Sequence, residues 1–151
     1  RRFPLGAPAD PETLRKLEAE VERVLNRMFD AIRPFKGGVA SVLITGGTAL
    51  NLAAIRRQIA PEQAPAFFQT SVSREDLETI YRRLAGADPE ARSKEAFLER
   101  GREDVIVPGL AILRSLIQVT GLETLTVTHM GLREGILGVL LRGQLVHGAA
   151  R

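Results

Sequence analysis

Two glycines between an apolar run and a helical pattern could form an anion-binding turn. The run Ala-Ser-Val-Leu-Ile-Thr at residues 40–45 is typical of a buried strand, and it stops at Gly46, Gly47 and Thr48. Glycine lets the backbone approach a ligand closely, and the start of the following helix presents free N–H groups to an anion. The spacing matches neither a P-loop nor a dinucleotide-binding fingerprint. Because a strand-to-helix turn needs glycine anyway, the pattern favours a structural turn and an anion site equally.

A second glycine turn follows the alternating run at residues 124–129, which is typical of a strand. Gly131 and Gly135 enclose Arg133 and Glu134 at the expected start of the last helix. Glutamate in a first helical turn is stabilised by the helix dipole, whereas arginine is less expected there. We interpret the two charges as an ion pair that holds the helix to the domain, with anion binding by Arg133 as the alternative.

Arg102 is a third candidate because it precedes a strongly apolar helical pattern. Its guanidinium could reach a phosphate or pair with Glu103 or Asp104, and the spacing does not decide between these partners. His129 and His147, the two histidines of the chain, lie far apart in the sequence without a carboxylate at ligand spacing. We therefore predict no metal site built from this chain alone.

Periodicity and capping signals predict alternating strands and helices around these candidates. Residues 1–9 resemble the end of an extended strand. Helices are expected at about 11–33, 49–58, 74–86, 89–98 and 103–120, with a last helix running to 141. The first helix should bury an apolar stripe made of Leu14, Leu17, Val21, Val24, Leu25, Met28 and Ile32. The order of elements predicts an α/β fold in which helices pack on a short sheet.

Composition narrows the class of protein. The chain has 151 residues, of which 44% are apolar and 26% charged, and this suits one globular domain. It contains 0 Cys, which excludes thiol chemistry, and no serine stands in a G-x-S-x-G context, so we expect no serine hydrolase. The net charge is +3, the basic residues are scattered and aromatic residues make up only 5%. We therefore predict no nucleic-acid partner.

The start of the sequence and its hydropathy give two further expectations. The chain begins with Arg1 rather than methionine, which suggests a segment of a longer protein. No stretch approaches the roughly 20 apolar residues that span a bilayer, and no signal-peptide pattern opens the chain. We expect a cytoplasmic protein without a membrane partner.

Three segments together resemble one known family. VLITGGTALNLAAI is similar to the glycine–glycine–threonine segment of the exopolyphosphatase/guanosine pentaphosphate phosphohydrolase (Ppx/GppA) family. FLERGREDVIVPGLAIL resembles its arginine-x-aspartate helix start, and VTHMGLREGILGVLL resembles its closing G-L-R-E-G helix. Their order and spacing fit, and FPLGA is similar to the strand that leads into the family's first helix, so the resemblance covers nearly the whole chain. Glu103 stands where alanine is common, and Phe97 replaces a usual glycine.

The resemblance implies a ribonuclease H-like lobe of the actin-like ATPase superfamily, in which two lobes flank a cleft. Residues 1–151 would form a single domain, most of the second lobe, truncated at its N-terminus. The sequence includes neither the first lobe, which carries the family's catalytic glutamate and a phosphate loop, nor the D-x-G-G-G-S hairpin that opens the second lobe. The first lobe of the same chain is then the expected partner, and a homodimer is a further candidate assembly.

The resemblance also implies a hydrolase that releases terminal phosphate from polyphosphate or guanosine pentaphosphate. A glutamate of the other lobe would activate water, and Mg²⁺, held mostly by ligands outside this segment, would stabilise the phosphoryl charge. No catalytic residue is then expected here, and the segment alone should be inactive. Gly46, Gly47 and Thr48 would line the floor of the cleft with backbone donors, and Arg102 and Arg133 would be the other phosphate-binding residues.

Two alternatives stay open. One is another kinase or ATPase of the actin-like superfamily that uses the glycine turn at an adenosine, although the G-L-R-E-G helix argues against it. The other is a non-catalytic ligand-binding or regulatory module. A first lobe with a phosphate hairpin and a glutamate would indicate the hydrolase, and its absence would indicate the module.

Overall fold

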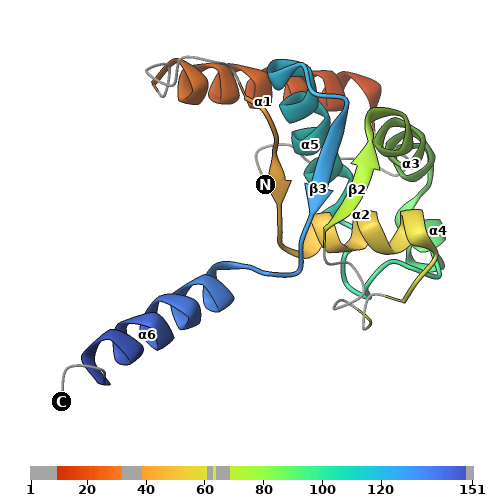
Figure 1. The fold of residues 1–151 in the computed structure, drawn as a ribbon. Helices are drawn as coiled ribbons and strands as arrows, with labels where there is room; N and C mark the ends of the chain where they lie inside the picture. The colour runs from red at the N-terminus through yellow and green to blue at the C-terminus, as the bar shows by residue number, and fades with distance from the viewer. Residues whose placement is uncertain (1–9, 32–38, 61–62, 64–68, 149–151) are drawn as a thin grey trace.

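The sheet at the centre of the fold has three strands in the order β1-β3-β2 (Figure 1). The computed structural model describes residues 10–31, 39–60, 63 and 69–148. β1 (Leu43–Ile44) is parallel to β3 (Thr124–Val127), and β2 (Thr70–Ser73) is antiparallel to it. β3 is therefore the central strand, and its alternate residues Leu125 and Val127 are fully buried on one face.

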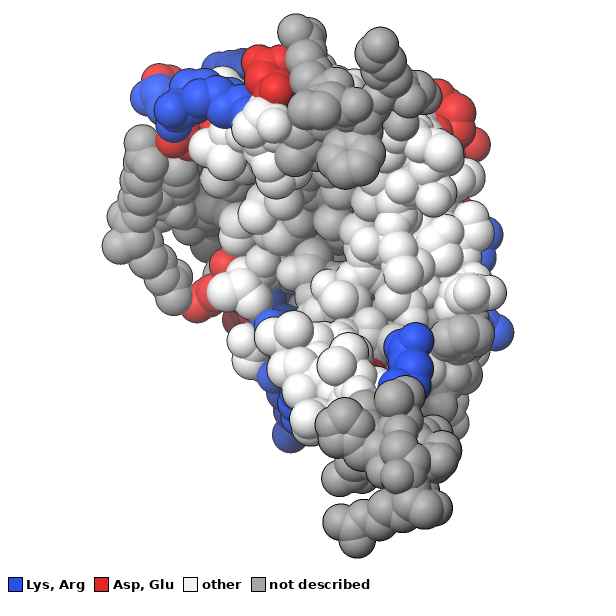
Figure 2. All heavy atoms as spheres, turned by 60° about the vertical axis from the view of Figure 1, so that its left-hand side comes forward, with Lys and Arg blue, Asp and Glu red and all other residues white. Residues whose placement is uncertain are grey.

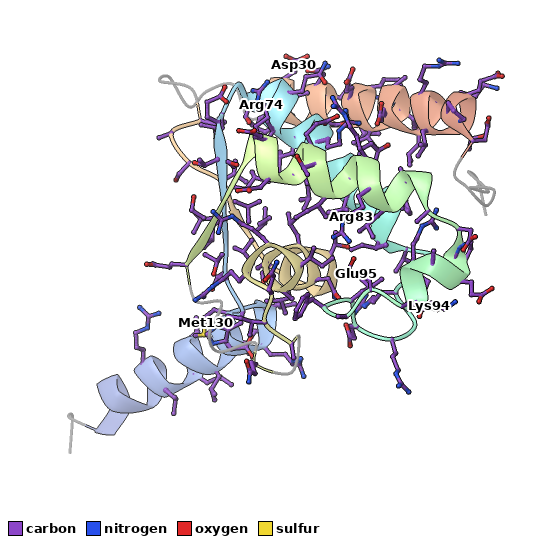
Figure 3. The ribbon with its side chains drawn as sticks, turned by 90° about the vertical axis from the view of Figure 1, so that its right-hand side faces the viewer. Asp30, Arg74, Arg83, Lys94, Glu95 and Met130 are labelled. Atoms are coloured by element: carbon purple, nitrogen blue, oxygen red, sulfur yellow. The ribbon has the colours of Figure 1, made fainter. Side chains whose placement is uncertain are left out.

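Helices cover that buried face of the sheet. α2 (Gly47–Arg57), α3 (Arg74–Gly86) and α5 (Ile106–Thr120) lie on one side of the strands, as the view along the sheet in Figure 3 shows. α1 (Pro11–Ala31) crosses one end of α5, and α4 (Pro89–Ser93) is a short helix after α3 (Figure 1). The largest fully buried helical side chains are Leu52, Leu77, Leu84, Ile106 and Leu110. The predicted α/β fold with helices packed on a short sheet is confirmed.

The apolar stripe predicted for the first helix is buried only in its N-terminal half. Leu17 is buried, whereas Val24 and Met28 are 49% and 47% exposed. The prediction of core positions at Val24 and Met28 is therefore wrong, because in the described residues only the N-terminal half of α1 lies against the rest of the core. Ile32, which belongs to the same stripe, lies outside the described residues.

Several element boundaries differ from those predicted. α2 begins at Gly47, two residues earlier than expected, and α6 runs on to Gly148. α4 ends at Ser93 rather than near 98, and residues 94–105 form turns before α5 begins at Ile106. β2 was not predicted at all, because Thr-Ser-Val-Ser holds only one apolar residue. The strand expected at residues 1–9 lies outside the described residues.

An ion cluster joins the three helices α1, α3 and α5. The Arg114 guanidinium donates to Glu18 and, over 2.7 Å, to Glu78, and it stacks 4.2 Å from the centre of the Tyr81 ring. The Tyr81 hydroxyl also donates to Glu18 over 2.9 Å. Burial acts to raise the pKa of Glu78, but hydrogen bonds and charge from Arg114 and Arg82 outweigh it, so this pKa lies below its ordinary value.

α6 (Leu132–Gly148) extends away from the rest of the molecule (Figure 1). Its apolar side chains have no core around them, and they include Leu132 at 80% exposure, Ile136, Leu137, Val139, Leu140 and Leu141. Charged side chains are sparse on the face that carries α6 and the β1 edge and gather at its margins (Figure 2). No helix in the described part of the chain is both long and apolar enough to cross a membrane.

Candidate functional site

The sheet brings the two glycine turns together. Parallel strands end at the same edge, and β1 and β3 are parallel neighbours, so the turns that follow them meet there. The amide of Thr128 donates to the carbonyl of Ile44 over 2.9 Å, which extends the pairing to the strand ends. A Cβ added at Gly131 would lie only 3.6 Å from Oγ1 of Thr45. The two segments that the sequence singled out therefore form one edge of the molecule.

A pocket of about 400 Å³ lies at this edge. It is lined by the turn after β1, the turn after β3 and the segment that precedes α5. Four of the five predicted site residues line it together: Gly46, Gly47, Arg102 and Arg133. The sequence did not predict that Glu99 and Glu134 would place two carboxylates in the same pocket.

The turn after β1 needs its first glycine for conformational reasons. Gly46 has a φ of 95°, in the left-handed region that side chains with a Cβ rarely adopt. Its carbonyl accepts the first backbone hydrogen bond of α2, from Leu50 over 3.0 Å, and Gly46 has no side chain with which to cap the helix. The first N–H groups of α2, a helix that begins at the pocket, therefore have no side-chain cap, as an anion site at a helix N-terminus requires.

Arg102 lies flat against the second glycine of that turn. A Cβ added at Gly47 would come 2.5 Å from Cζ and 2.7 Å from Nη1 of Arg102, so only glycine leaves room for the guanidinium. Nε of Arg102 donates to Oε2 of Glu99 over 3.0 Å. This bond uses the Nε–H group of Arg102. The two Nη groups of the guanidinium lie beside Gly47, at the start of α2. A fork of this kind suits two oxygens of one phosphate.

Thr48 has a different surrounding from its two glycine neighbours. Its side chain does not line the pocket but lies against Gly109 of α5, where an added Cβ would come 2.7 Å from Cγ2 of Thr48. The side chain therefore packs α2 against α5. Thr48 can therefore take part in the predicted anion site only through its backbone N–H, which belongs to the first turn of α2.

Glu134 does not form the ion pair that the sequence suggested. Its Oε2 accepts a hydrogen bond from the amide of Gly131 over 2.7 Å, and no ion pair joins it to Arg133 within the described residues. The amide of Gly131, together with the amide of Glu134 itself and weaker effects of Arg133 and His129, lowers the pKa of this carboxyl. Glu134 thus caps its own helix, and Arg133 is an exposed cation at the pocket.

Two buried polar side chains anchor the segment that carries Arg102. Asn51, only 1% exposed, exchanges hydrogen bonds with Glu99, and Arg92, 3% exposed, donates to the carbonyls of Leu84 and Glu103 over 2.7 and 3.1 Å. Sequence reasoning missed both. An asparagine among the apolar residues of the second helix was the available signal, since a buried amide needs hydrogen-bond partners.

The described residues contain no group of three or more His, Asp, Glu or Cys side chains that could hold a metal ion. The two carboxylates of the pocket, Glu99 and Glu134, already accept hydrogen bonds from Arg102 and from the Gly131 amide. The described donor set does not fit a Mg²⁺ site of its own.

Comparison with known proteins identifies the family. The model of the Ppx/GppA phosphatase family matches residues 3–142, which is most of the chain. The chain belongs to the Ppx/GppA phosphatase family. The resemblance based on the two glycine turns and Arg102 is thereby confirmed, while a comparison with curated protein sequences gave no match.

Solved structures of the Ppx/GppA family share this fold. The Aquifex aeolicus family member superposes with a TM-score of 0.83 at 22% identity, over 94% of this chain and 44% of that one. An exopolyphosphatase from Cytophaga hutchinsonii superposes with a TM-score of 0.79 at 21% identity, over 94% of this chain and 46% of that one. The likeness confirms the predicted ribonuclease H-like fold. The chain spans less than half the length of either structure.

Proposed function

We propose that this chain is the second lobe of a two-lobe phosphohydrolase and that its pocket binds the phosphate chain of the substrate. One observation supports this more than any other: Arg102 lies flat on Gly47, so its Nη groups lie beside the first turn of α2, which has no side-chain cap. Backbone N–H groups and a guanidinium are the donors that bind phosphate oxygens best. Arg133, at the start of α6, adds a second cation to the pocket.

The residues of this chain would bind and orient the substrate rather than carry out the bond cleavage. Hydrolysis of a terminal phosphoanhydride needs a base for water, and the carboxylates of the pocket are already held by hydrogen bonds from Arg102 and Gly131. We assign the base to the other lobe. Mg²⁺, when bound, would neutralise charge on the phosphoryl oxygens, and we assign its ligands to the other lobe as well. Arg102 and Arg133 would hold the remaining phosphates.

α6 supports the proposal that a first lobe covers part of this chain. A helix whose apolar residues reach nearly all the way round is typical of a buried position, yet Leu132, Val139 and Leu140 are 80%, 67% and 59% exposed. The solved relatives are more than twice as long as this chain. We therefore propose that α6 packs against the first lobe of the same protein. A homodimer is the other assembly that would bury it.

Polyphosphate and guanosine pentaphosphate share the phosphate chain that this pocket is proposed to bind, and we propose both as substrates. The test measures phosphate release from each compound by the full-length protein and by the 151-residue chain. We expect release by the full-length protein and none by the chain alone. A full-length protein that binds tripolyphosphate without releasing phosphate would support the non-catalytic module. Release by the chain alone would show that the catalytic groups lie here.

A further inference from the structure

We propose that Asn51 is the positioning residue that fixes Arg102 beside the N-terminus of α2. The proposal deepens the proposed function and rests on it, because it concerns how the two phosphate-binding groups are held at one place. Asn51 itself is 1% exposed and does not line the pocket, so it would act only through the residues that it holds.

The side-chain amide of Asn51 bridges the two walls of the pocket. Its Nδ2 donates to the carbonyl of Gly47 over 2.8 Å, one helical turn back on α2. The same group donates to Oε2 of Glu99 over 3.5 Å, and Oδ1 accepts from the amide of Glu99 over 2.6 Å. One side chain therefore contacts the start of α2 with one bond and the Arg102 segment with two.

Glu99 passes this constraint on to Arg102. Its Oε2 accepts hydrogen bonds from both Nδ2 of Asn51 and Nε of Arg102. The carboxylate therefore links the buried amide of Asn51 to the guanidinium that is proposed to bind phosphate. The carboxylate sets the direction of the guanidinium, because a bond to Nε turns the two Nη groups toward Gly47. Within the described residues, the hydrogen bonds that tie the backbone and the carboxylate of Glu99 to α2 are those of Asn51.

The Arg102 segment needs such a tie because it has no regular structure. Residues 94–105 form turns between α4 and α5, and no strand of the sheet includes them. Arg92 holds the segment on the far side of Arg102, through the carbonyl of Glu103, and thereby links it to the end of α3. Asn51 is the link to α2, and α2 carries the N–H groups with which Arg102 must act.

Core packing alone does not explain an asparagine at this position. Its neighbours on α2, Leu52, Ala53 and Ala54, are all completely buried and apolar. An amide is costly to bury unless its donors and acceptor are used, and a leucine, which has a similar size and the same branching, would occupy this position without that cost. The hydrogen bonds of the Asn51 amide with Gly47 and Glu99 account for an asparagine at this position.

The first test follows Arg102 directly, without any ligand. The Nε–H signal of Arg102 in a ¹H–¹⁵N spectrum of the full-length protein is assigned by its loss in Arg102→Ala. We expect this signal to shift and broaden in Asn51→Ala. Asn51→Ser is the safer second variant, because a serine hydroxyl can still bond the Gly47 carbonyl one turn back but is too short to reach Glu99. An unchanged signal in Asn51→Ser would overturn the proposal.

The second test measures binding of tripolyphosphate by calorimetry. In the unmodified background, Asn51→Ala and Asn51→Ser should each weaken binding by about threefold to tenfold. In the Arg102→Ala background, the same two substitutions should weaken binding by less than about twofold, because Arg102 is no longer there to be positioned. Ser115→Ala removes an equally buried polar side chain of α5, away from the pocket, and should leave the affinity unchanged. Equal losses in the presence and absence of Arg102 would refute positioning. If Arg102→Ala binds tripolyphosphate normally while the Nε–H signal still depends on Asn51, the positioning is supported and the phosphate site is refuted.

Discussion

Replacing Arg102 by alanine in the full-length protein separates its functional role from its structural one. The proposed phosphate contact consists of two charge-assisted hydrogen bonds from the Nη groups. Because the side chain is 38% exposed, solvent weakens these bonds, and we expect a loss of about 2 kcal/mol, or roughly 30-fold in affinity. Arg102→Lys keeps the charge without the fork and should recover part of this loss.

The structural cost of the same substitution should be small. The ion pair of Arg102 with Glu99 is 3.0 Å long between side chains that are 38% and 50% exposed. Such pairs contribute about 0–1 kcal/mol to the free energy of unfolding, which corresponds to a melting temperature lower by no more than about 4 °C. The KM for polyphosphate should therefore rise while the melting temperature hardly changes.

The assay measures KM for polyphosphate at two salt concentrations, together with melting temperatures. Salt should weaken binding by the unmodified protein more than binding by Arg102→Ala, because the variant has lost a charge that salt screens. Arg100→Ala is the matched control: it removes the same charge from an exposed residue two positions away that does not line the pocket. An unchanged KM in Arg102→Ala, or an equal rise in Arg100→Ala, would refute the reasoning.

Three further predictions concern Gly47, the ion cluster around Glu78, and α6. Gly47→Ala places a Cβ 2.5 Å from Cζ of Arg102, so it should weaken tripolyphosphate binding about as much as Arg102→Ala, with no further loss in the double variant and little change in melting temperature. The pKa of Glu78 is lowered in the folded protein, so its contribution to stability is present above its ordinary pKa of 4.5 and is lost as the pH falls through the folded value. Acid unfolding monitored by circular dichroism should therefore show a fall in stability over this pH range. In Arg114→Met, which removes the main partner of Glu78, this fall should be smaller. Leu140→Asp, on the exposed face of α6, should lower the melting temperature of the full-length protein by several degrees if the first lobe covers it, and leave it unchanged if solvent does.

Local signals in the sequence predicted the parts of the fold that depend on neighbouring residues. Ser73 and Asp76 form a capping box at the start of α3, with the Asp76 amide donating to Oγ of Ser73 over 3.0 Å. Gly121 ends α5 in the left-handed conformation, and Pro108 lies in the first turn of that helix, where its missing N–H costs little. In each case the residue and its partner are a few positions apart, so the pattern is visible in the sequence.

Contacts between distant segments could not be read in the same way. The bond from the Glu99 amide to Asn51 spans 48 positions, and the place of Arg102 over Gly47 depends on it. The stripe of α1 predicts an apolar face but not what covers that face. The exposure of Val24 and Met28, in the second half of α1, could therefore not be predicted from the sequence. The sequence identified Gly46, Gly47, Arg102 and Arg133 separately, and the parallel pairing of β1 with β3 is what brings them into one pocket.

A titration of the ¹⁵N-labelled full-length protein with tripolyphosphate tests the central claim most directly. The account predicts that the amide signals of residues 46–49 and 131–133 and the Nε–H signal of Arg102 shift together, with one dissociation constant. A second pocket, of about 540 Å³ and lined by Arg56 and Arg83, offers cations of its own between α2 and α3. Figure 3 shows Arg83 on α3, and its guanidinium pairs with Glu95. Shifts confined to that second pocket, or no shifts at the two glycine turns, would contradict the claim.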